Sequence, residues 1–411
     1  MSGPLSGLRV LELSRILAGP WAGQLLADYG AEVIKIERPG NGDDTRSWGP
    51  PYLKDDAGQE TAESAYFLST NRGKHSVAID IARPEGQELV RRLALDCDVL
   101  IENFKVGGLV KYGLDYASLA AAHPGLVYCS ITGFGQDGPY AGHAGYDAAI
   151  QAMGGLMSIT GGPDDLPGGG PQKVGVAVAD LMCGLYAVTA IQAALLHRQA
   201  SGQGQHIDLS LLDTQVAWLA NQAGNYLIGG QVPGRQGTAH PNIVPYQVFA
   251  TNDGHDMLAV GNDAQFARFA ELAGHPEWAT DPDFATNRAR VNQREQLLPL
   301  IDSVMRQGST DDWVNACRAA GVPVSPINDL KRVFADPQVQ HRRMVRHLNH
   351  PLRQDLPTVA NPVRFSETPV DYQRAPPLLG VDTHRILTER LGLDRPQLDR
   401  LAQTGIIQAM S

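Results

Sequence analysis

The chain has 411 residues, of which 43% are hydrophobic and 19% charged; this composition is typical of a folded globular protein of two or three domains and excludes a disordered one. Its formal net charge of -10 argues against a dedicated nucleic-acid-binding protein, although a local basic pocket for an anionic ligand stays compatible with it. The four cysteines, Cys97, Cys129, Cys183 and Cys317, form no C-x-x-C pair, so zinc and redox motifs are unsupported and buried free thiols in a reducing compartment are expected.

Short apolar runs alternate with helical patterns through the first third of the chain. Each run is apolar throughout rather than alternating, which is typical of a parallel sheet with helices on both faces, and predicts an α/β fold. Ligands of such sheets bind outside the carboxyl ends of the strands, so the loop residues there are the candidates to inspect. The predicted strands are 8–14, 31–37, 75–81, 98–104 and 125–132, and the predicted helices are 19–30 and 84–96.

The segment "KVGVAVADLMCGLYAVTAIQAALLHR", Lys173 to Arg198, is almost entirely apolar apart from Asp180. Its length would suffice to cross a bilayer, but it carries polar residues and stands alone in a soluble-looking chain, so we predict a buried strand followed by a buried helix and no membrane association. Because "VGVAVA" can be a strand, Asp180 is predicted to cap the helix. A helix N-terminus also favours the ionised carboxylate, which can act as a nucleophile toward an activated acyl group.

The composition changes after Asp213, and loops rich in Gly, Pro and His are followed by mostly helical patterns over 264–320. We therefore predict a small α+β domain over 220–335, and a large discontinuous domain formed by 1–219 and 336–411. Short strands such as 361–365 are expected in the last part of the chain. The N-terminus lacks a basic flank followed by a long apolar stretch, so no secretory signal is predicted and a cytoplasmic location is expected.

A glycine-rich motif, a set of basic residues and one histidine bear on function. The sequence "GFGQDG", Gly133 to Gly138, matches a dinucleotide fingerprint, but Pro139 follows where a helix should begin, so we interpret it as a loop. Basic residues recur just after strands, which favours an anionic ligand over scattered surface charge. These residues are Arg15, Arg38, Arg46, Arg72, Lys74 and Lys105.

Among the histidines, His240 is the strongest candidate for a functional residue, because it lies in a Gly- and Pro-rich loop. No Ser-His-Asp order, zinc-protease motif or P-loop motif is present in the sequence.

Several long segments of the chain, in order, resemble the class III CoA-transferases, the CaiB/BaiF group. They include "LSGLRVLELSRILAGPWAGQLLADYGAEVIKIERPGNGDDTR", "NRGKHSVAIDI", "DVLIENFKVGGLVKYGLDY", "LVYCSITGFGQDGPYAGHAGYDAAIQAMGGLMSITG", "VGVAVADLMCGLYAVTAIQAALLHR" and "APPLLGVDTHRIL". Within the group the chain is most similar to the branch that acts on succinyl-CoA and dicarboxylic acids such as glutarate. The resemblance implies a Rossmann-like large domain with a smaller domain, and an intertwined homodimer.

The resemblance also implies a covalent mechanism and a set of site residues. Asp180 would attack the donor thioester to give an aspartyl anhydride and then an aspartyl-CoA thioester, with Asp147 of the "GYD" motif beside it as an orienting or charge-tuning partner. CoA and acyl-CoA would be substrates, with no permanently bound cofactor or metal. The residues implied to contact CoA are Arg15, Ile16, Leu17, Arg38, Arg72, Lys74, Asn103, Phe104 and Lys105.

Departures from related branches narrow the expected substrate. The region "VGNDAQF", 260–266, replaces the glycine-run loop of the oxalate-specific branch, so oxalate is disfavoured as acceptor. Tyr146 stands where the 2-methylacyl-CoA racemases have a histidine, which weakens a racemase reading because proton exchange needs an acid or base on each face. A racemase and a catalytically silent CoA-binding protein remain the alternatives. Arg15, Arg46, Tyr146 and His240 are the candidates for contacting the acceptor acid.

Overall fold

The structure is a computed structural model that describes residues 3–408 of the chain. These residues form two compact units, and each is described by itself. Within the described residues the larger unit contains 3–156, 174–223 and 340–408, and the smaller one contains Met157–Lys173 and Gly224–Val339. The sequence pattern had assigned residues 157–173 to the larger domain, whereas the structure groups them with the smaller unit.

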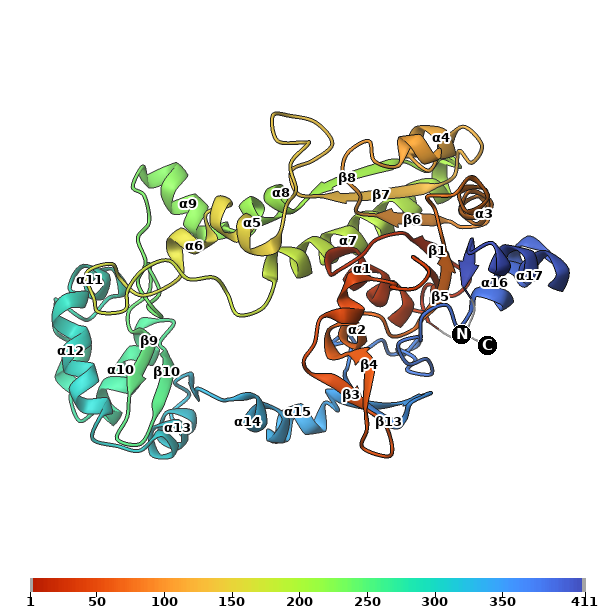
Figure 1. Cartoon of the computed structure of the whole chain (residues 1–411). Coiled ribbons are helices and arrows are strands. Elements are labelled where there is room, and N and C mark those ends of the chain that lie inside the picture. The colour runs from red at the N-terminus through yellow and green to blue at the C-terminus, as the bar shows by residue number, and fades with distance from the viewer. Residues whose placement is uncertain (1–2, 409–411) are drawn as a thin grey trace. The chain divides into compact units, whose positions relative to one another are not determined.

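A seven-stranded sheet forms the centre of the larger unit, with the strand order β14-β5-β2-β1-β6-β7-β8 (Figure 1). Every pairing is parallel except that of β14 with β5. The strands β5 and β7 are buried at all six positions, as expected of strands between two layers of helices, although β5 begins with the polar residues Lys74, His75 and Ser76. The strands are β1 Arg9–Glu12, β2 Glu32–Glu37, β5 Lys74–Ile79, β6 Val99–Glu102, β7 Val127–Thr132, β8 His206–Ser210 and β14 Ile407–Gln408. The parallel sheet predicted from the apolar runs is confirmed.

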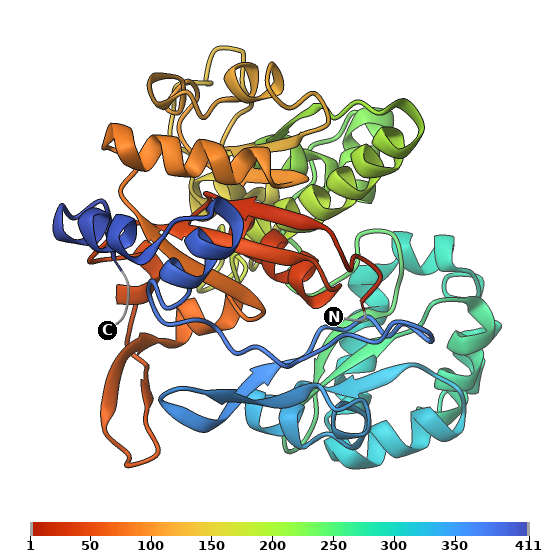
Figure 2. The same cartoon turned by 90° about the vertical axis from the view of Figure 1, so that its right-hand side faces the viewer.

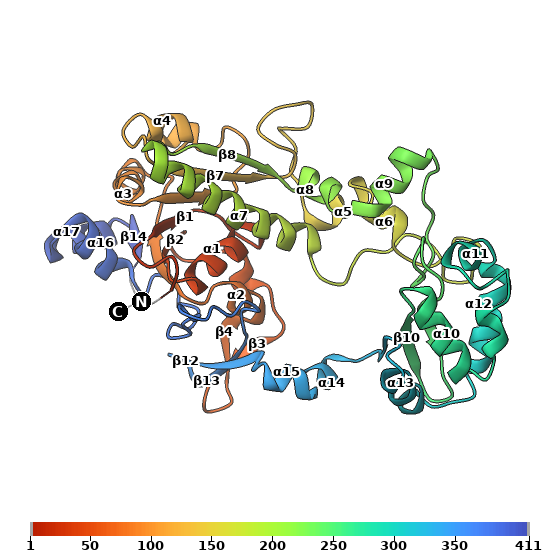
Figure 3. The same ribbon diagram turned by 180° about the vertical axis from the view of Figure 1, so that it is seen from behind.

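Helices cover both faces of this sheet because alternate strand residues point to opposite sides. Leu11 packs in a core with α3 (Pro84–Leu95) and α16 (Thr383–Leu391), and its neighbour Val10 packs in a second core with α1 (Ala18–Asp28) and α7 (Val178–Ser201). The helices α1 and α7 lie side by side (Figure 3). The remaining elements of this unit and its borders are η1 Asp44–Ser47, β3 Tyr52–Lys54, β4 Glu60–Ser64, α2 Ala65–Thr70, η2 Val110–Tyr112, α4 Tyr116–Ala120, α5 Asp147–Met153, α6 Leu156–Ile159, α8 Leu211–Ala217, α9 Ala220–Gly229, β12 Val345–His350, β13 Arg353–Val359 and α17 Arg395–Gln403.

The long apolar helix α7 differs from its prediction at its start. Residues 174–177 form no strand, the helix begins at Val178 after the N-cap residue Ala177, and Asp180 is its third residue rather than its cap. Among the described residues, α7 is the one helix long and apolar enough to cross a membrane, with a mean hydropathy of 1.6. Core helices of soluble proteins pass the same test, and Ala179, Cys183 and Ala187 of α7 are fully buried against the sheet. All four cysteines are free and buried, as expected.

One strand predicted near the C-terminus is wrong. Residues 361–365 are not extended into a ladder, because the side chain of Asn361 accepts a hydrogen bond from the Val363 N–H and turns the chain. The same side chain donates to Asp28 of α1 (2.9 Å), which attaches this segment to the larger unit.

The smaller unit has a three-stranded antiparallel sheet in the order β11-β10-β9, with helices packed on it (Figure 2, teal to cyan). Phe249, Leu258, Phe266 and Phe269 meet in its core. Its elements are β9 Tyr246–Ala250, β10 His255–Ala259, α10 Asp263–Leu272, η3 Pro276–Ala279, α11 Asn287–Asn292, α12 Arg294–Met305, α13 Thr310–Ala319, β11 Val324–Pro326, α14 Leu330–Ala335 and α15 Pro337–His341. The helical character predicted for 264–320 is confirmed.

Candidate active site

A cavity of about 170 Å³ lies at the carboxyl ends of β1, β6 and β7, beside the first turn of α7. Loops that follow the three strands supply most of its walls, in the place where open parallel sheets bind their ligands. It brings together nine of the residues singled out from the sequence. These are Arg15, Ile16, Leu17, Asn103, Phe104, Lys105, Tyr146, Asp147 and Asp180.

The two carboxyl groups of this cavity meet at the start of α7. Asp147, the first residue of α5, accepts hydrogen bonds at Oδ1 from the backbone N–H groups of Ala179 (2.8 Å) and Asp180 (3.4 Å). Asp147 therefore satisfies the free N–H groups of α7 from another element, in the role that the sequence had given to Asp180. Burial, and secondly the charge of Asp147, raises the pKa of Asp180 to about 7. Near neutral pH the Asp180 side chain is thus present both as a carboxylic acid and as a nucleophilic carboxylate.

The turn between β1 and α1 is held in an unusual conformation. Ile16 has a φ of 72°, in the left-handed region that β-branched residues rarely adopt. Its N–H donates to both carboxylate oxygens of Asp43 (3.2 Å each). The neighbouring Arg15 is clamped by Asn103, whose side chain accepts from its N–H (2.9 Å) and donates to its carbonyl (2.8 Å). Backbone strain of this kind concentrates at functional sites, where surrounding contacts maintain it.

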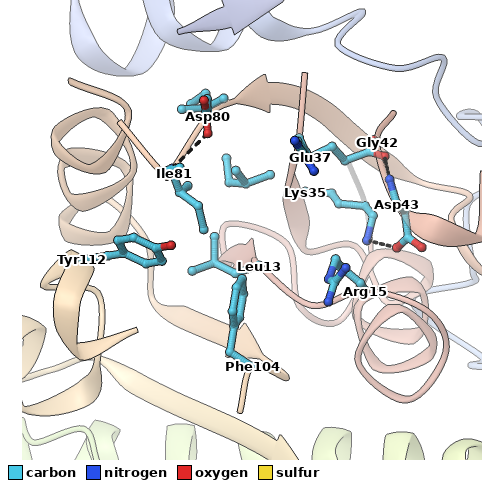
Figure 4. Close-up of a pocket in the computed structure, with 14 residues that line it drawn as sticks. Leu13, Arg15, Lys35, Glu37, Gly42, Asp43, Asp80, Ile81, Phe104 and Tyr112 are labelled. Carbon is cyan, nitrogen blue, oxygen red and sulfur yellow. Dashed lines mark hydrogen bonds and ion pairs between the residues drawn. The ribbon is translucent and has the colours of Figure 1, made fainter. Parts of the chain in front are cut away.

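A second cavity, of about 470 Å³, adjoins the first, because Arg15 and Phe104 line both (Figure 4). Leu13, Phe104 and Tyr112 form apolar walls of this larger cavity. The exposed guanidinium groups of Arg15 and Arg38 supply positive charge on its lining, although Arg15 is paired with Asp44 (2.6 Å). An elongated ligand with an aromatic, anionic end fits this pair of cavities, since apolar surface and cations are both within reach.

Arg72 and Lys74 do not line either cavity. The Arg72 guanidinium donates to both oxygens of Asp28 (2.9 and 2.6 Å) and to the Val359 carbonyl (2.8 Å). The Lys74 ammonium group is fully buried and bonded to Glu12, to the Pro20 carbonyl and to Asn71. Their donors are occupied inside the fold, so the structure corrects the expectation that they contact phosphates and gives them a structural role.

The structure also corrects the expectation that Arg46 contacts the acceptor acid. Its guanidinium is buried, donates to Glu37 (2.8 Å) and Glu63 (3.1 Å), and lies 3.6 Å above the centre of the Phe67 ring. It is therefore not available to an acceptor acid. His240 belongs to the smaller unit, where its Nδ1 accepts from the Asn242 N–H (3.0 Å), and it is not among the residues that the larger unit brings together.

The loop 133–138 crosses the loop that contains Gly145. No helix begins in "GFGQDG", as predicted, and a Cβ atom at Gly133 would lie 2.6 Å from the Cα of Gly145, so glycine is needed where the two loops cross. Sequence reasoning missed Asp43, which holds Ile16, and Gln151, which bonds to Asp147. The signal for Gln151 was a polar side chain four residues after Asp147, on the same face of a short helix. Among the described residues no group of three or more His, Cys, Asp or Glu side chains is arranged to hold a metal ion.

Comparison with known proteins identifies relatives over nearly the whole chain. The family model for CoA-transferase family III matches residues 5–383. Succinate--glutarate CoA-transferase of Agrobacterium fabrum is 52% identical over 392 residues, which cover 95% of this chain and 97% of that protein. Human succinyl-CoA:glutarate CoA-transferase is 43% identical over 98% of this chain and 90% of its own length. The crystal structure of a CaiB/BaiF family protein from Brucella suis, 50% identical, superposes with a TM-score of 0.83 over 95% of this chain and all of that one.

Proposed function

The chain belongs to CoA-transferase family III, and on this basis we propose that it moves CoA from succinyl-CoA to glutarate or a closely similar small dicarboxylate. The relatives named for this reaction are similar over nearly their full length, which supports the substrate pair. The observation that carries the proposal is the Asp180 side chain in the small cavity, beside Asp147 and next to the larger cavity.

Four acyl transfers at Asp180 accomplish the exchange. The ionised carboxylate attacks the thioester carbon of succinyl-CoA, which forms a succinyl-aspartyl anhydride and releases the CoA thiolate. The thiolate then attacks the aspartyl carbonyl carbon, which releases succinate and leaves an aspartyl-CoA thioester. A glutarate carboxylate attacks the aspartyl carbonyl carbon of this thioester, which breaks the C–S bond, releases the CoA thiolate and forms a second anhydride. The thiolate then attacks the glutaryl carbon of this anhydride to give glutaryl-CoA and free Asp180. Division of one difficult exchange into four easier steps is the advantage of a covalent nucleophile.

In this proposal the two adjoining cavities bind different parts of acyl-CoA. The nucleotide end of CoA lies in the larger cavity between Phe104 and Tyr112, and Arg38 faces its phosphate groups. The pantetheine arm passes the turn at Ile16 and reaches Asp180 in the smaller cavity, where Lys105 and Tyr146 also stand. Tyr146, which is largely exposed, and Arg15 remain the proposed contacts of the acceptor acid within the larger unit.

The assembly and the compartment are proposals from family resemblance and composition. We expect an intertwined homodimer, which size-exclusion chromatography with light scattering would show as a particle of twice the chain mass. A cytoplasmic location agrees with four buried free thiols, because these persist in a reducing compartment.

The test is a transfer assay with a matched pair of variants. The protein is incubated with succinyl-CoA and a panel of carboxylic acids, and new thioesters are identified by mass spectrometry. We expect glutaryl-CoA from the wild type and from Asp137→Asn, an exposed loop variant, and none from Asp180→Asn. Full activity of Asp180→Asn would refute the nucleophile, and no transfer to any acid would refute the function. Exchange of the α-proton of a 2-methylacyl-CoA in deuterated water, without transfer, would instead identify a racemase.

A further inference from the structure

Gln151 lies entirely buried inside α5, four residues after Asp147, and both ends of its amide are bonded. Its Nε2 donates to Oδ2 of Asp147 (2.7 Å), and its Oε1 accepts from the backbone N–H of Val174 (2.9 Å). A carboxylate only accepts and a backbone N–H only donates, so the orientation of the amide is fixed by its two partners.

These bonds continue through Asp147 to the start of α7. The Oδ2 atom of Asp147 faces Gln151, while its Oδ1 accepts from the N–H groups of Ala179 and Asp180. The stretch from Val174 to Asp180, which contains the irregular residues 174–177 and the start of α7, is therefore bonded at both of its ends to one side-chain pair on α5. Rotation of the Asp147 carboxylate would break the bonds to α7, and Gln151 opposes that rotation.

We propose that Gln151 is a positioning residue of the transferase reaction, which fixes the Asp147 carboxylate and the approach to α7 so that the Asp180 side chain is held for attack on the thioester; this inference rests on the proposed function. A neutral amide suits the task because it orients Asp147 without adding charge beside Asp180. Tyr66 of α2 and Cys183 of α7 are titratable groups near Asp180, and burial first, with a smaller contribution from the charge of Asp180, raises the pKa of both.

The first experiment replaces the amide with an apolar side chain of similar length. We expect Gln151→Met to lower kcat by roughly 10- to 100-fold while the KM for succinyl-CoA changes by less than about threefold, as is usual when the partner of a reacting group is lost. The matched control is Gln215→Met, because Gln215 is equally buried but its amide has no hydrogen-bond partner among the described residues. Equal kcat values for Gln151→Met and the control would overturn the inference.

The second experiment uses a pH signature that a purely structural role would not produce. Gln151→Glu has the shape of glutamine, and only its protonated form can donate to Asp147. Two carboxyl groups in hydrogen-bond contact share one proton, which raises the pKa of the pair. We therefore expect the activity of Gln151→Glu relative to wild type to rise as the pH falls from 8 to 6. A ratio that stays constant over this range would contradict the proposal.

A third measurement separates this inference from the proposed function, since it needs no substrate. The side chains of the aspartates are labelled with ¹³C, and the Asp180 signal is assigned by its loss in Asp180→Asn. In Gln151→Met the pH titration of the Asp180 signal should differ from that of the wild type, because the Asp147 carboxylate beside it is no longer held in place. An unchanged titration refutes the role of Gln151. If the wild type transfers no CoA, the proposed function fails, and the titration alone still decides the inference.

Discussion

At the scale of single residues, the ionisation of Asp180 controls the first acyl transfer. Only the carboxylate is a nucleophile, and burial together with Asp147 holds the pKa of Asp180 at about 7. This value differs from that of an ordinary surface aspartate by enough to place the titration within the range of a routine assay. The enzyme thus works with part of its nucleophile protonated.

The pH dependence follows directly. We expect kcat/KM to fall as the pH drops through about 7, because Asp180 takes up a proton. In Asp147→Asn the neighbouring charge is removed, so the acid limb should move to lower pH by up to about one unit, even if the maximal rate is reduced. The measurement is a pH–rate profile between pH 5.5 and 9, with Asp137→Asn as the control that keeps the wild-type limb. An acid limb that Asp147→Asn leaves in place would show that the charge of Asp147 does not reach Asp180.

Ile16 supplies a second prediction at this scale. At an ordinary position alanine is more favourable than glycine by about 0.5–1 kcal/mol, whereas at positive φ the order reverses by about 1 kcal/mol because glycine has no Cβ. Since Ile16 has a φ of 72°, we expect Ile16→Gly to be more stable than Ile16→Ala. Urea unfolding of the pair measures the difference, and the same pair at Leu196, an exposed position in α7, should show the usual order. Ile16→Ala as the more stable variant would argue against strain at this turn.

At the scale of elements, the regular part of the fold was predictable and the starting points of the site elements were not. The mostly apolar run of β7 was a sufficient signal for a buried strand, whereas β5 is buried throughout although its first three residues are polar or charged. The start of α7 depends on Asp147, which lies 33 residues before Asp180 and caps the helix across space. The "VGVAVA" segment had the composition of a strand, but no partner strand pairs with it in the described structure.

The basic residues also show that contacts between distant parts of the chain were not predictable from the sequence. Arg38 directly follows β2 and is exposed on a cavity, whereas Lys74 is the first residue of β5 and is buried. The difference is set by Glu12 on β1, whose carboxylate contacts both Lys74 (2.9 Å) and Lys35 (2.9 Å). Spacing along the chain indicates which end of a strand a residue occupies, and it does not indicate which residues from other strands it meets.

This buried group of charges gives a prediction for the sheet. Removal of one charge from a buried ion pair typically costs about 3 kcal/mol or more, because the remaining charge stays out of water. We therefore expect Glu12→Gln to lower the free energy of unfolding by about 3 kcal/mol. The control is Glu60→Gln in the exposed part of β4, which should be close to neutral. Denaturant unfolding followed by circular dichroism measures both, and equal stability of the two variants would contradict the structural role of the cluster.

At the scale of the whole molecule, the two units differ in their buried charged groups: the larger unit has the ion pairs of Glu12 with two lysines, and the smaller unit has Asp256. In the smaller unit Asp256 is fully buried, and neither of its oxygens has a hydrogen-bond partner among the described residues. Burial, followed by the charges of Asp253 and Asp311, raises the pKa of Asp256 to about 6. A raised carboxyl pKa stabilises the folded state at low pH, and this contribution is lost as the pH rises from about 4 to about 6.

Replacement of Asp256 by a neutral residue should therefore increase the free energy of unfolding by an amount that depends on pH. Asp256→Asn should increase stability at pH 7.5 by on the order of 2 kcal/mol, and the gain should vanish below about pH 3, where Asp256 is protonated in both states. Hydrogen exchange of peptides from β9 and β10 at the two pH values reports on the smaller unit directly. Asp165→Asn, at an exposed position of the same unit, serves as the control. A gain of equal size at both pH values would rule out titration of Asp256 as its cause.

The pairing of β14 with β5 has a consequence for how the chain is made. Ile407 pairs with Ile79, so the sheet acquires its last edge strand more than 300 residues after the strand that it covers. During synthesis β5 can pair with β2 early, whereas the backbone groups on its outer edge at Ala78 and Ile79 stay unpaired until β14 has been made. An open edge of this kind is a site for pairing between chains. A chain without β14 thus exposes backbone groups at the end of β5 that can pair with another chain, and pairing with β14 covers them.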